Sequence, residues 1–449
     1  MKPKTTLTLF IILVILFGFY YFYQYKGGQA RKAAKERASK LLLFEKDSVK
    51  TIVFRKPDQT IVLRKEDNGI WHIVSPISTK ADVSQVNSIL NTLTNAKIER
   101  IVADSTANWA AYGLQPPKAT LVLEYKNGKK DSIIVGDRNA TRSYTFVRVN
   151  NQPRVVLSSS SLANDAEKTL FNLRNKDVLE FQKGQVKKVT LVVKGRKYVA
   201  EKREGKWYLT FPVERLADAD EIDKILNRLD MERATEFVTE KPKRLSDYGL
   251  AKPDYVIELI LSPNDAKKKL LIGKKLDDDK YYAKDDSRDP VMKIAKYLVD
   301  DLPKNLFEIS DKHVLNFDRN AITEVTISYN DTTITIKKDT SNTWTVVEPD
   351  TFKAKTWRMS SLLGTMERLK AEEIVTQHVK NLRKYGLDKP ICTASVVDSL
   401  GKVQEILYWG KKAKNATSYV TNKKKEKVFR VKSYNLDSIK LHLKDLKEE

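Results

Sequence analysis

One pattern recurs three times along the chain and limits what it can fold into. Trp71, Trp207 and Trp344 are 136 and 137 residues apart, and proline follows each tryptophan five residues later. A Tyr-Gly-Leu tripeptide follows each tryptophan at forty-one residues. The prolines are Pro76, Pro212 and Pro349. The tyrosines and glycines of the tripeptides are Tyr112, Gly113, Tyr248, Gly249, Tyr385 and Gly386. A fixed period of this kind is the signature of repeated structural units. We therefore predict three tandem copies of one fold.

The repeat also sets the expected domain boundaries. Its three units cover residues 41–177, 178–313 and 314–449. In front of them come a short basic tail at 1–4, an apolar segment at 5–25 and a basic linker at 26–40. With 449 residues, of which 41% are hydrophobic, the chain is long enough for about three separate cores.

Each unit combines signals for strands and helices. It opens with short alternating runs, such as residues 51–54, 61–63 and 70–73, which predict an antiparallel meander. Later runs at 120–125, 132–135 and 144–149 predict further strands, before a closing helix near 162–173. The expected fold class is α+β, with an antiparallel sheet and two or three helices in each unit.

The first helix of each unit has a recognisable start. Asp82 and Asp218 are each followed three residues later by Gln85 or Glu221, which resembles a capping box. The third unit has Lys355 at this place, so Thr356 is expected to cap its helix.

The Tyr-Gly-Leu tripeptide has a local explanation. A short helix ends there, glycine adopts the left-handed conformation, leucine folds back, and a following proline stops the helix. The recurring residues are of the types that cores and turns require, and only tyrosine among them offers weak acid–base chemistry. We interpret them as scaffold rather than as a ligand-stacking site.

The apolar segment predicts a membrane anchor. Twenty-one residues without charge lie between Lys4 and Lys26, which is long enough to cross a bilayer as a helix. Tyrosines crowd its C-terminal end, as in an interfacial belt. A cleaved signal peptide is the alternative, but the apolar run is long for one.

The orientation of this anchor is open from charge alone. The basic residues after it would hold the long part of the chain in the cytoplasm and would also contact an anionic surface; they are Lys26, Arg31, Lys32, Lys35, Arg37 and Lys40. A four-residue tail is instead typical of a signal anchor, whose large domain is exported whatever its charge. We favour a single-pass protein of the cytoplasmic membrane with its bulk outside.

The net charge of +24, from 82 Lys and Arg against 58 Asp and Glu, favours anionic surroundings. A basic solvated surface is the simpler explanation. The densest basic run in the repeats is 423–427, and it lacks the interleaved aromatic residues of nucleic-acid binders, so we expect no nucleic-acid partner.

No pattern of catalytic residues is apparent. Cys392 is the only cysteine, the four histidines stand far apart, and the aspartates at 277–279 lack the spacing of a calcium loop. Phosphate-binding loops and nucleophile elbows are missing too. We predict no catalytic residues, no cofactor and no metal.

The tryptophan with its proline, the Tyr-Gly-Leu turn and the late apolar run ending in glycine resemble an uncharacterised bacterial family of membrane-anchored domains. Ala81-Asp82 and Ala217-Asp218 fit its pattern, and Ala354-Lys355 departs from it. Members are often encoded beside gliding-motility-type ABC transporter permeases. The resemblance implies a fold and an accessory role in the envelope, without catalytic residues.

Three functions follow as hypotheses. The first is a non-catalytic, membrane-anchored accessory or scaffold protein of the bacterial envelope with protein partners, associated with an ABC-type transport or gliding-motility-like machine. The second is an envelope hydrolase with a site between units. The third is a binder of anionic envelope polymers or lipid headgroups. The oligomeric state is left open.

Overall fold

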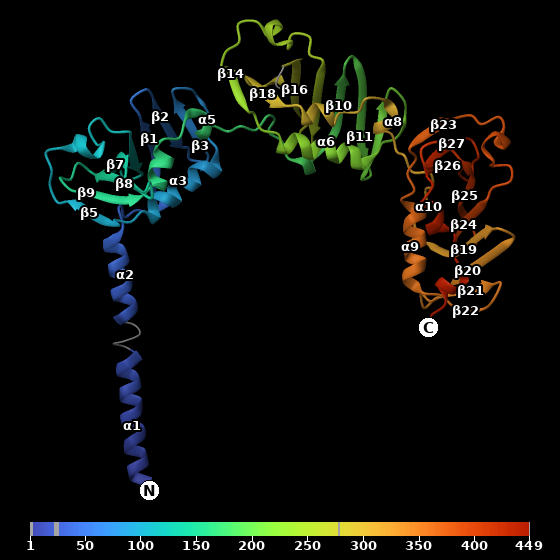
Figure 1. The fold of residues 1–449 in the computed structure, drawn as a ribbon, viewed down its shortest axis with the longest axis horizontal. Coiled ribbons are helices and arrows are strands. Elements are labelled where there is room, and N and C mark those ends of the chain that lie inside the picture. Colours follow the sequence, from blue (N-terminus) through green and yellow to red (C-terminus); the bar gives the residue numbers. More distant parts are fainter. Residues whose placement is uncertain (1–2, 22–26, 277–278, 449) are drawn as a thin grey trace. The chain divides into compact units, whose positions relative to one another are not determined.

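The structure, a computed structural model, describes residues 3–21, 27–276 and 279–448. The described chain falls into two compact units, residues 1–177 with 233–238, and residues 178–232 with 239–449. Three sheets of nine strands follow one another in sequence, and all three have the same strand order (Figure 1). The prediction of three tandem repeats is confirmed.

The first sheet has the order β4-β3-β2-β1-β6-β7-β8-β9-β5. Its strands are β1 Val49–Arg55, β2 Thr60–Lys65, β3 Trp71–Ser75, β4 Thr79–Lys80, β5 Arg100–Ala103, β6 Ala119–Tyr125, β7 Lys130–Arg138, β8 Tyr144–Val149 and β9 Val155–Ser159. Its helices are α3 Val83–Asn95, α4 Ser161–Ala166 and α5 Leu170–Leu173, with the short turn η3 Trp109–Tyr112. Strands β1 to β4 and strands β6 to β9 pair with their neighbours along the chain. In addition, β1 pairs with β6 and β9 pairs with β5, and all of these pairs are antiparallel.

The second sheet repeats this order as β13-β12-β11-β10-β15-β16-β17-β18-β14. Its strands are β10 Val186–Val193, β11 Arg196–Arg203, β12 Lys206–Phe211, β13 Arg215–Leu216, β14 Glu236–Thr239, β15 Tyr255–Leu261, β16 Ala266–Lys275, β17 Lys280–Asp285 and β18 Val291–Ala295. The helices are α6 Ala219–Met231, α7 Tyr297–Asp300 and α8 Leu306–Ile309, with the turns η4 Lys183–Gln185 and η5 Leu245–Tyr248.

The third sheet has the order β22-β21-β20-β19-β24-β25-β26-β27-β23. Its strands are β19 Ile322–Tyr329, β20 Thr332–Lys338, β21 Trp344–Glu348, β22 Phe352–Lys353, β23 Glu373–Thr376, β24 Cys392–Asp398, β25 Val403–Lys412, β26 Thr417–Thr421 and β27 Val428–Lys432. The helices are α9 Thr356–Glu367, α10 Asn435–Ile439 and α11 Leu443–Leu446, with the turn η6 Leu382–Tyr385.

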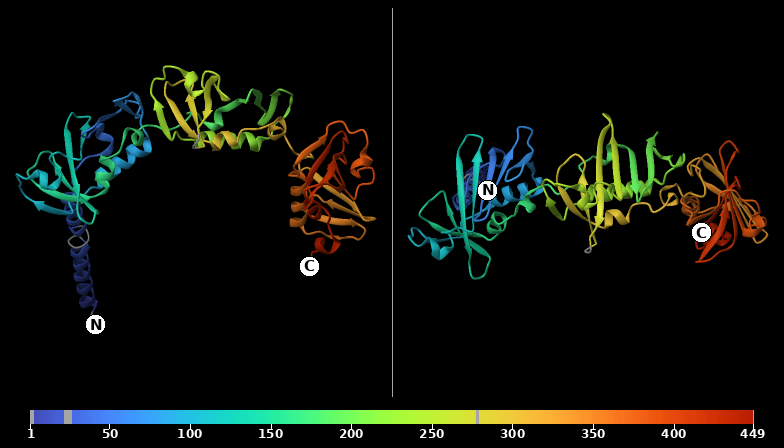
Figure 2. Two further views of the ribbon diagram at one scale, coloured as in Figure 1. Left: turned by 45° about the horizontal axis from the view of Figure 1, so that its top comes forward. Right: turned by 90° about the horizontal axis from the view of Figure 1, so that it is seen from above.

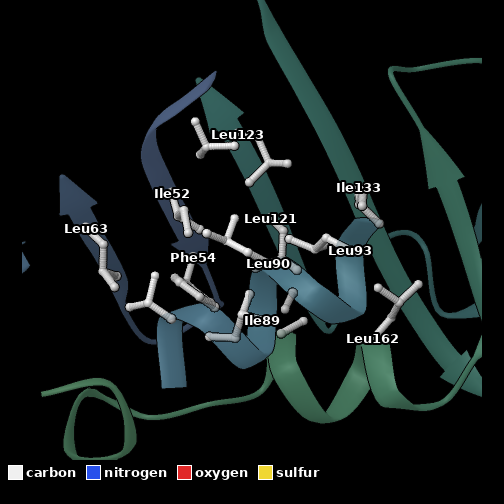
Figure 3. Close-up of a cluster of buried hydrophobic side chains, with 14 of the residues drawn as sticks. Ile52, Phe54, Leu63, Ile89, Leu90, Leu93, Leu121, Leu123, Ile133 and Leu162 are labelled. Carbon is white, nitrogen blue, oxygen red and sulfur yellow. The ribbon is translucent and has the colours of Figure 1, made fainter. Parts of the chain in front are cut away.

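In repeat 1 the core lies between one face of the sheet and the helices α3, α4 and α5. In β6 every second residue is buried, and in α3 the buried residues Val86, Ile89, Leu90 and Leu93 recur at helical spacing. Figure 3 shows the side chains of α3 meeting those of Ile52, Phe54 and Leu121 from the strands. Each large apolar side chain buried in this way contributes roughly 1.5–3 kcal/mol. The two views in Figure 2 show the long helix of the middle repeat along one side of its strands.

The predicted α+β fold class is wrong, because each repeat is mostly sheet. Beside nine strands, only α3, α6 and α9 are longer than six residues within the described repeats, at 13, 13 and 12 residues. β7 is longer than its apolar run, since it covers Lys130–Arg138 where 132–135 was expected, whereas β8 covers Tyr144–Val149 as expected. The closing helix near 162–173 is split into α4 and α5, because Thr169 caps a new helix.

The expected transmembrane helix is also corrected. The N-terminal helix α1 covers Pro3–Phe19 and has 17 residues. Among the residues that the structure describes, no helix has both the length and the apolar character needed to cross a membrane. Most of the basic linker is helical, as α2 Gly27–Ser39, and Lys26 lies outside the described residues.

Candidate functional site at the repeat junctions

The recurring tryptophans and prolines occupy equivalent structural places. The three tryptophans lie at the first or second position of β3, β12 and β21, the third strand of each repeat in chain order. Trp71, Trp207 and Trp344 are 3–5% exposed. The bonds before Pro76, Pro212 and Pro349 are all cis. The three tryptophans are therefore core residues of their repeats.

The Tyr-Gly-Leu turns pass directly over the glycine of a neighbouring strand. Gly113, Gly249 and Gly386 each end a 3₁₀ turn with φ of 63°, 71° and 67°. A Cβ added to the strand glycines would collide with the carbonyl oxygen of the turn tyrosine. The strand glycines are Gly136, Gly273 and Gly410. The late glycine of each repeat is thus required by close approach of two backbones.

A recurring aromatic pair stabilises this crossing, and sequence reasoning missed it. Tyr112 packs on Phe146, Tyr248 on Tyr282 and Tyr385 on Tyr419, with ring centroids 5.1 Å apart in every repeat. Pairs of this kind contribute about 0.5–1.5 kcal/mol beyond burial. The alternation of Phe and Tyr at the partner position hides it from inspection of the sequence.

The first helix of repeats 1 and 2 begins at an aspartate that also binds a lysine from the end of the same repeat. Asp82 accepts a hydrogen bond from Gln85 N at 3.1 Å and lies 3.2 Å from Lys176 Nζ. Lys176 donates as well to the carbonyl oxygens of Phe171, Asn172 and Arg174, at 3.2–3.3 Å. One ammonium thus joins a helix start to the segment that leads into repeat 2.

The equivalent contact in repeat 2 is more buried. Asp218, 3% exposed, accepts from Asp220 N at 3.1 Å and lies 2.8 Å from Lys312 Nζ. Lys312 also donates to Glu308 O at 2.7 Å. The ammonium of Lys312 therefore holds the helix start against the chain that enters repeat 3. We call this contact, with its counterpart at Asp82 and Lys176, the latch.

A lysine of repeat 3 also contacts the latch residue Asp218 of repeat 2. Lys370, between α9 and β23, lies 2.7 Å from Asp220 and 3.6 Å from Asp218. Burial lowers the pKa of Lys370, but Asp220 and Asp218 outweigh it and raise that pKa. In repeat 3 the cap position holds Lys355, which makes no side-chain cap, so the expected Thr356 cap is wrong and Thr356 is the first helical residue.

Other charged contacts lie near the junctions, one within repeat 2 and others between repeats 1 and 2. His313 Nδ1 lies 2.5 Å from Asp311 Oδ1, and this hydrogen bond raises the pKa of His313 against the opposing effect of burial. In the first junction Arg233 Nε lies 2.9 Å from Asp177 Oδ1. The Arg174 guanidinium stacks on Phe237 at 3.3 Å. The junction of repeats 1 and 2 thus combines an ion pair with aromatic contacts, since Phe171 also packs on Phe237.

Other residues considered in the sequence lie apart. Cys392 is 2% exposed, and burial raises its pKa to about 11, so it is a core residue. Asp279 pairs with Lys275 and Lys296, which hold its pKa at about 2, while 277 and 278 lie outside the described residues. His72 lies beside Glu66 at 3.5 Å. Within the described residues, no three His, Cys, Asp or Glu side chains gather as a metal site would require.

The basic residues of the N-terminal linker fall into two groups. Arg31, Lys32, Lys35 and Arg37 are exposed along helix α2. Lys40 is half-buried and donates from Nζ to Thr94 O at 2.8 Å. Lys40 therefore belongs to repeat 1 rather than to a free linker surface.

Two solved structures illustrate the similarities that were found. A DNA polymerase sliding clamp from Pseudomonas aeruginosa is 6% identical, with 88% of this chain and 94% of that chain covered, at a TM-score of 0.15. A Ca²⁺-stabilized adhesin from an Antarctic bacterium is 9% identical over 87% and 83%, at a TM-score of 0.08. Similarities at this level carry no argument about fold or function.

Curated proteins include no match to this chain. A family of domains, by contrast, matches three times in succession, over residues 71–230, 207–355 and 344–449. Each match begins at one of the three recurring tryptophans. The matches together span most of the chain, which therefore belongs to the family DUF4340, a domain of unknown function.

Proposed function

We propose that this protein is a non-catalytic accessory or scaffold protein of the bacterial envelope that presents its repeats to protein partners. The observation that carries the proposal is Trp357. It stands at the position of repeat 3 that matches Asp220 of repeat 2, and Asp220 contacts the following repeat through Lys370 at 2.7 Å. Trp357 is 64% exposed. Repeat 3 thus offers a tryptophan where repeat 2 makes a contact.

The chemistry around Trp357 favours an acidic protein surface as the partner. Exposed tryptophan is a typical anchor of protein interfaces. Lys355 replaces the capping aspartate two residues before it, and Lys355 makes no ion pair among the described residues. A chain of net charge +24 would repel a second copy of itself, whereas an acidic partner would be attracted.

Membrane association is part of the proposal. Eight successive side chains of α1, from Phe10 to Phe17, are 47–71% exposed and apolar. A continuous apolar surface of this kind needs an apolar environment. The resemblance noted from the sequence supports the cytoplasmic membrane as that environment, with the repeats outside it and an ABC-type transport or gliding-motility-like machine as partner.

Affinity capture of the intact protein from gently solubilised membranes tests the partner. The wild type is compared with Trp357→Ser and with Leu400→Ser, which alters a side chain that is 89% exposed in a turn. We expect a subunit of such a machine to be captured by the wild type and by Leu400→Ser but not by Trp357→Ser. Capture of the same proteins by all three, or of none by the wild type, contradicts the proposal.

A thiol reporter tests the side of the membrane. Cys392 is replaced by Ser, and a cysteine is placed at exposed Asn127, in the turn between β6 and β7. Labelling of intact spheroplasts by a membrane-impermeant reagent is the expected result. Labelling only after permeabilisation would place the repeats in the cytoplasm and would overturn the envelope location.

A further inference from the structure

A polar pocket of about 420 Å³ lies in the second compact unit, beside the latch. Residues of repeat 2 and repeat 3 line it together. The lining residues that matter below are Arg215, Asn316, Glu405, Lys424, Glu426 and Lys427. Its size is within the range of small-molecule sites.

The wall formed by repeat 3 is held in place by hydrogen bonds. Asn422 Nδ2, at the start of the turn between β26 and β27, donates to Val314 O at 3.1 Å. Val379 N donates to Glu426 O at 3.0 Å from the other side. The turn that carries Lys424 and Lys427 is therefore fixed at both ends before any ligand arrives, which lowers the entropy lost on binding.

The charges around the pocket do not cancel. Among its acidic residues, Glu214 pairs with Arg203 at 2.7 Å and Asp311 pairs with His313 at 2.5 Å. Arg215, Lys424 and Lys427 form no ion pair with any described residue. The lining therefore includes three cations without ion-pair partners in the described part of the chain, beside two further carboxylates, Glu405 and Glu426, and an anionic ligand would be attracted.

Glu405 also lines this pocket. Its Oε1 accepts a hydrogen bond from Asn316 N at 3.4 Å, while its Oε2 is buried and has no hydrogen-bond partner among the described residues. Burial raises the pKa of Glu405, and nearby backbone N–H groups, including that of Asn316, oppose this rise. Because Oε2 is shielded from solvent, a ligand in the pocket cannot contact this oxygen, and Glu405 adds only a negative charge to the lining.

In the corresponding turn of repeat 2, the basic residue Arg288 pairs with an acidic residue of the same turn. There Asp285 binds Arg288 Nε at 2.8 Å and Ser287 Oγ at 2.7 Å. Arg288 Nη2 donates to Val178 O at 2.9 Å, which matches the contact of Asn422 with Val314. Lysines without acidic partners are thus a property of the repeat 3 turn and not of the repeated fold.

We propose that this pocket binds a small anionic ligand, a carboxylate or a phosphate. Arg215, Lys424 and Lys427 contact the anionic group. This binding role goes beyond the scaffold function and does not depend on it.

Calorimetric titration of the full-length protein in detergent with inorganic phosphate and with D-glucuronate tests the proposal. The variant Lys424→Ala/Lys427→Ala is compared with Lys411→Ala/Lys412→Ala, which removes the same charge from the exposed end of β25. We expect the pocket variant to bind about tenfold more weakly or worse and the control to bind as the wild type does. Circular dichroism checks that both variants are folded.

The two probes separate the sources of the anionic group. Binding of phosphate alone assigns a phosphate ligand, and binding of glucuronate alone assigns a carboxylate; either supports the pocket. Equal loss in the two double variants, or no binding of either probe by the wild type, overturns the proposal.

Discussion

Lys312 Nζ lies 2.8 Å from Asp218 Oδ2, and the same carboxylate caps α6 by accepting from Asp220 N at 3.1 Å. One side chain thereby starts a helix and holds the chain that leads into the next repeat. The side chains of Asp218 and Lys312 are 3% and 14% exposed. An ion pair this well removed from water depends strongly on both partners being present.

We therefore predict a strong energetic coupling in the latch. A double-mutant cycle of Asp218→Asn and Lys312→Met should give a coupling of about 1–3 kcal/mol in the unfolding transition of repeat 2. The matched control is Asp220→Asn with Lys370→Met, where Asp220 is 84% exposed and the coupling should be about 0–1 kcal/mol. Denaturant unfolding followed by tryptophan fluorescence measures both. Similar values for the two cycles would refute the role given to burial.

The crossing of two backbones predicts an intolerance to even one added carbon. In Gly273→Ala the new Cβ would collide with the Tyr248 carbonyl, so the turn must move, at a cost of about 1–3 kcal/mol. Gly184→Ala is the control, because nothing lies within 4 Å of its added Cβ. Its effect should stay within about 0.5 kcal/mol. Equal stability of the two variants in urea would show that the crossing yields without strain.

Each repeat has its own tryptophan in its own core, so damage to one should stay local. Trp207 is 5% exposed. Its replacement by Ala should lower the free energy of unfolding of repeat 2 by roughly 3–5 kcal/mol. Limited proteolysis of Trp207→Ala measures this directly, with Trp357→Ala as the control for an exposed tryptophan. Simultaneous cleavage throughout all three repeats would mean that the repeats unfold as one body.

The sequence predicts local features, such as helix starts and turns, better than it predicts the proportion of sheet to helix. The helix starts at Asp82 and Asp218 and the left-handed Gly113 depend on residues within three or four positions, and the structure places them as expected. The sheet content was underestimated, because strand ends such as Lys130 are polar. Pairing with a neighbouring strand, which the sequence does not display, extends them.

The junction residues were missed for a different physical reason. Lys312 meets Asp218 across 94 residues, and a lone lysine far from its partner gives no local signal. The same holds for the pocket, whose Arg215 and Lys424 belong to different repeats. The basic run at 423–427 was noticed in the sequence, but the unpaired Glu405 beside it becomes evident only when the strands are in place.

The stability that His313 gives to the fold should fall as pH rises. His313 has a raised pKa in the folded protein, chiefly through its hydrogen bond to Asp311, with burial and Lys370 opposing and Asp218 assisting. A raised folded pKa means that protonated His313 stabilises the fold fully below its ordinary value of 6.5. That stabilisation is lost as pH rises through the folded pKa.

Thermal unfolding of the wild type and of His313→Gln from about pH 5 to pH 9 measures this effect. The wild type should be the more stable at the acidic end, and the difference in Tm should shrink as His313 loses its proton. Asp311→Asn removes the partner that raises the pKa and should flatten the pH dependence in the same way. A difference that grows with pH, or one that Asp311→Asn leaves unchanged, would show that His313 does not carry a stabilising charge.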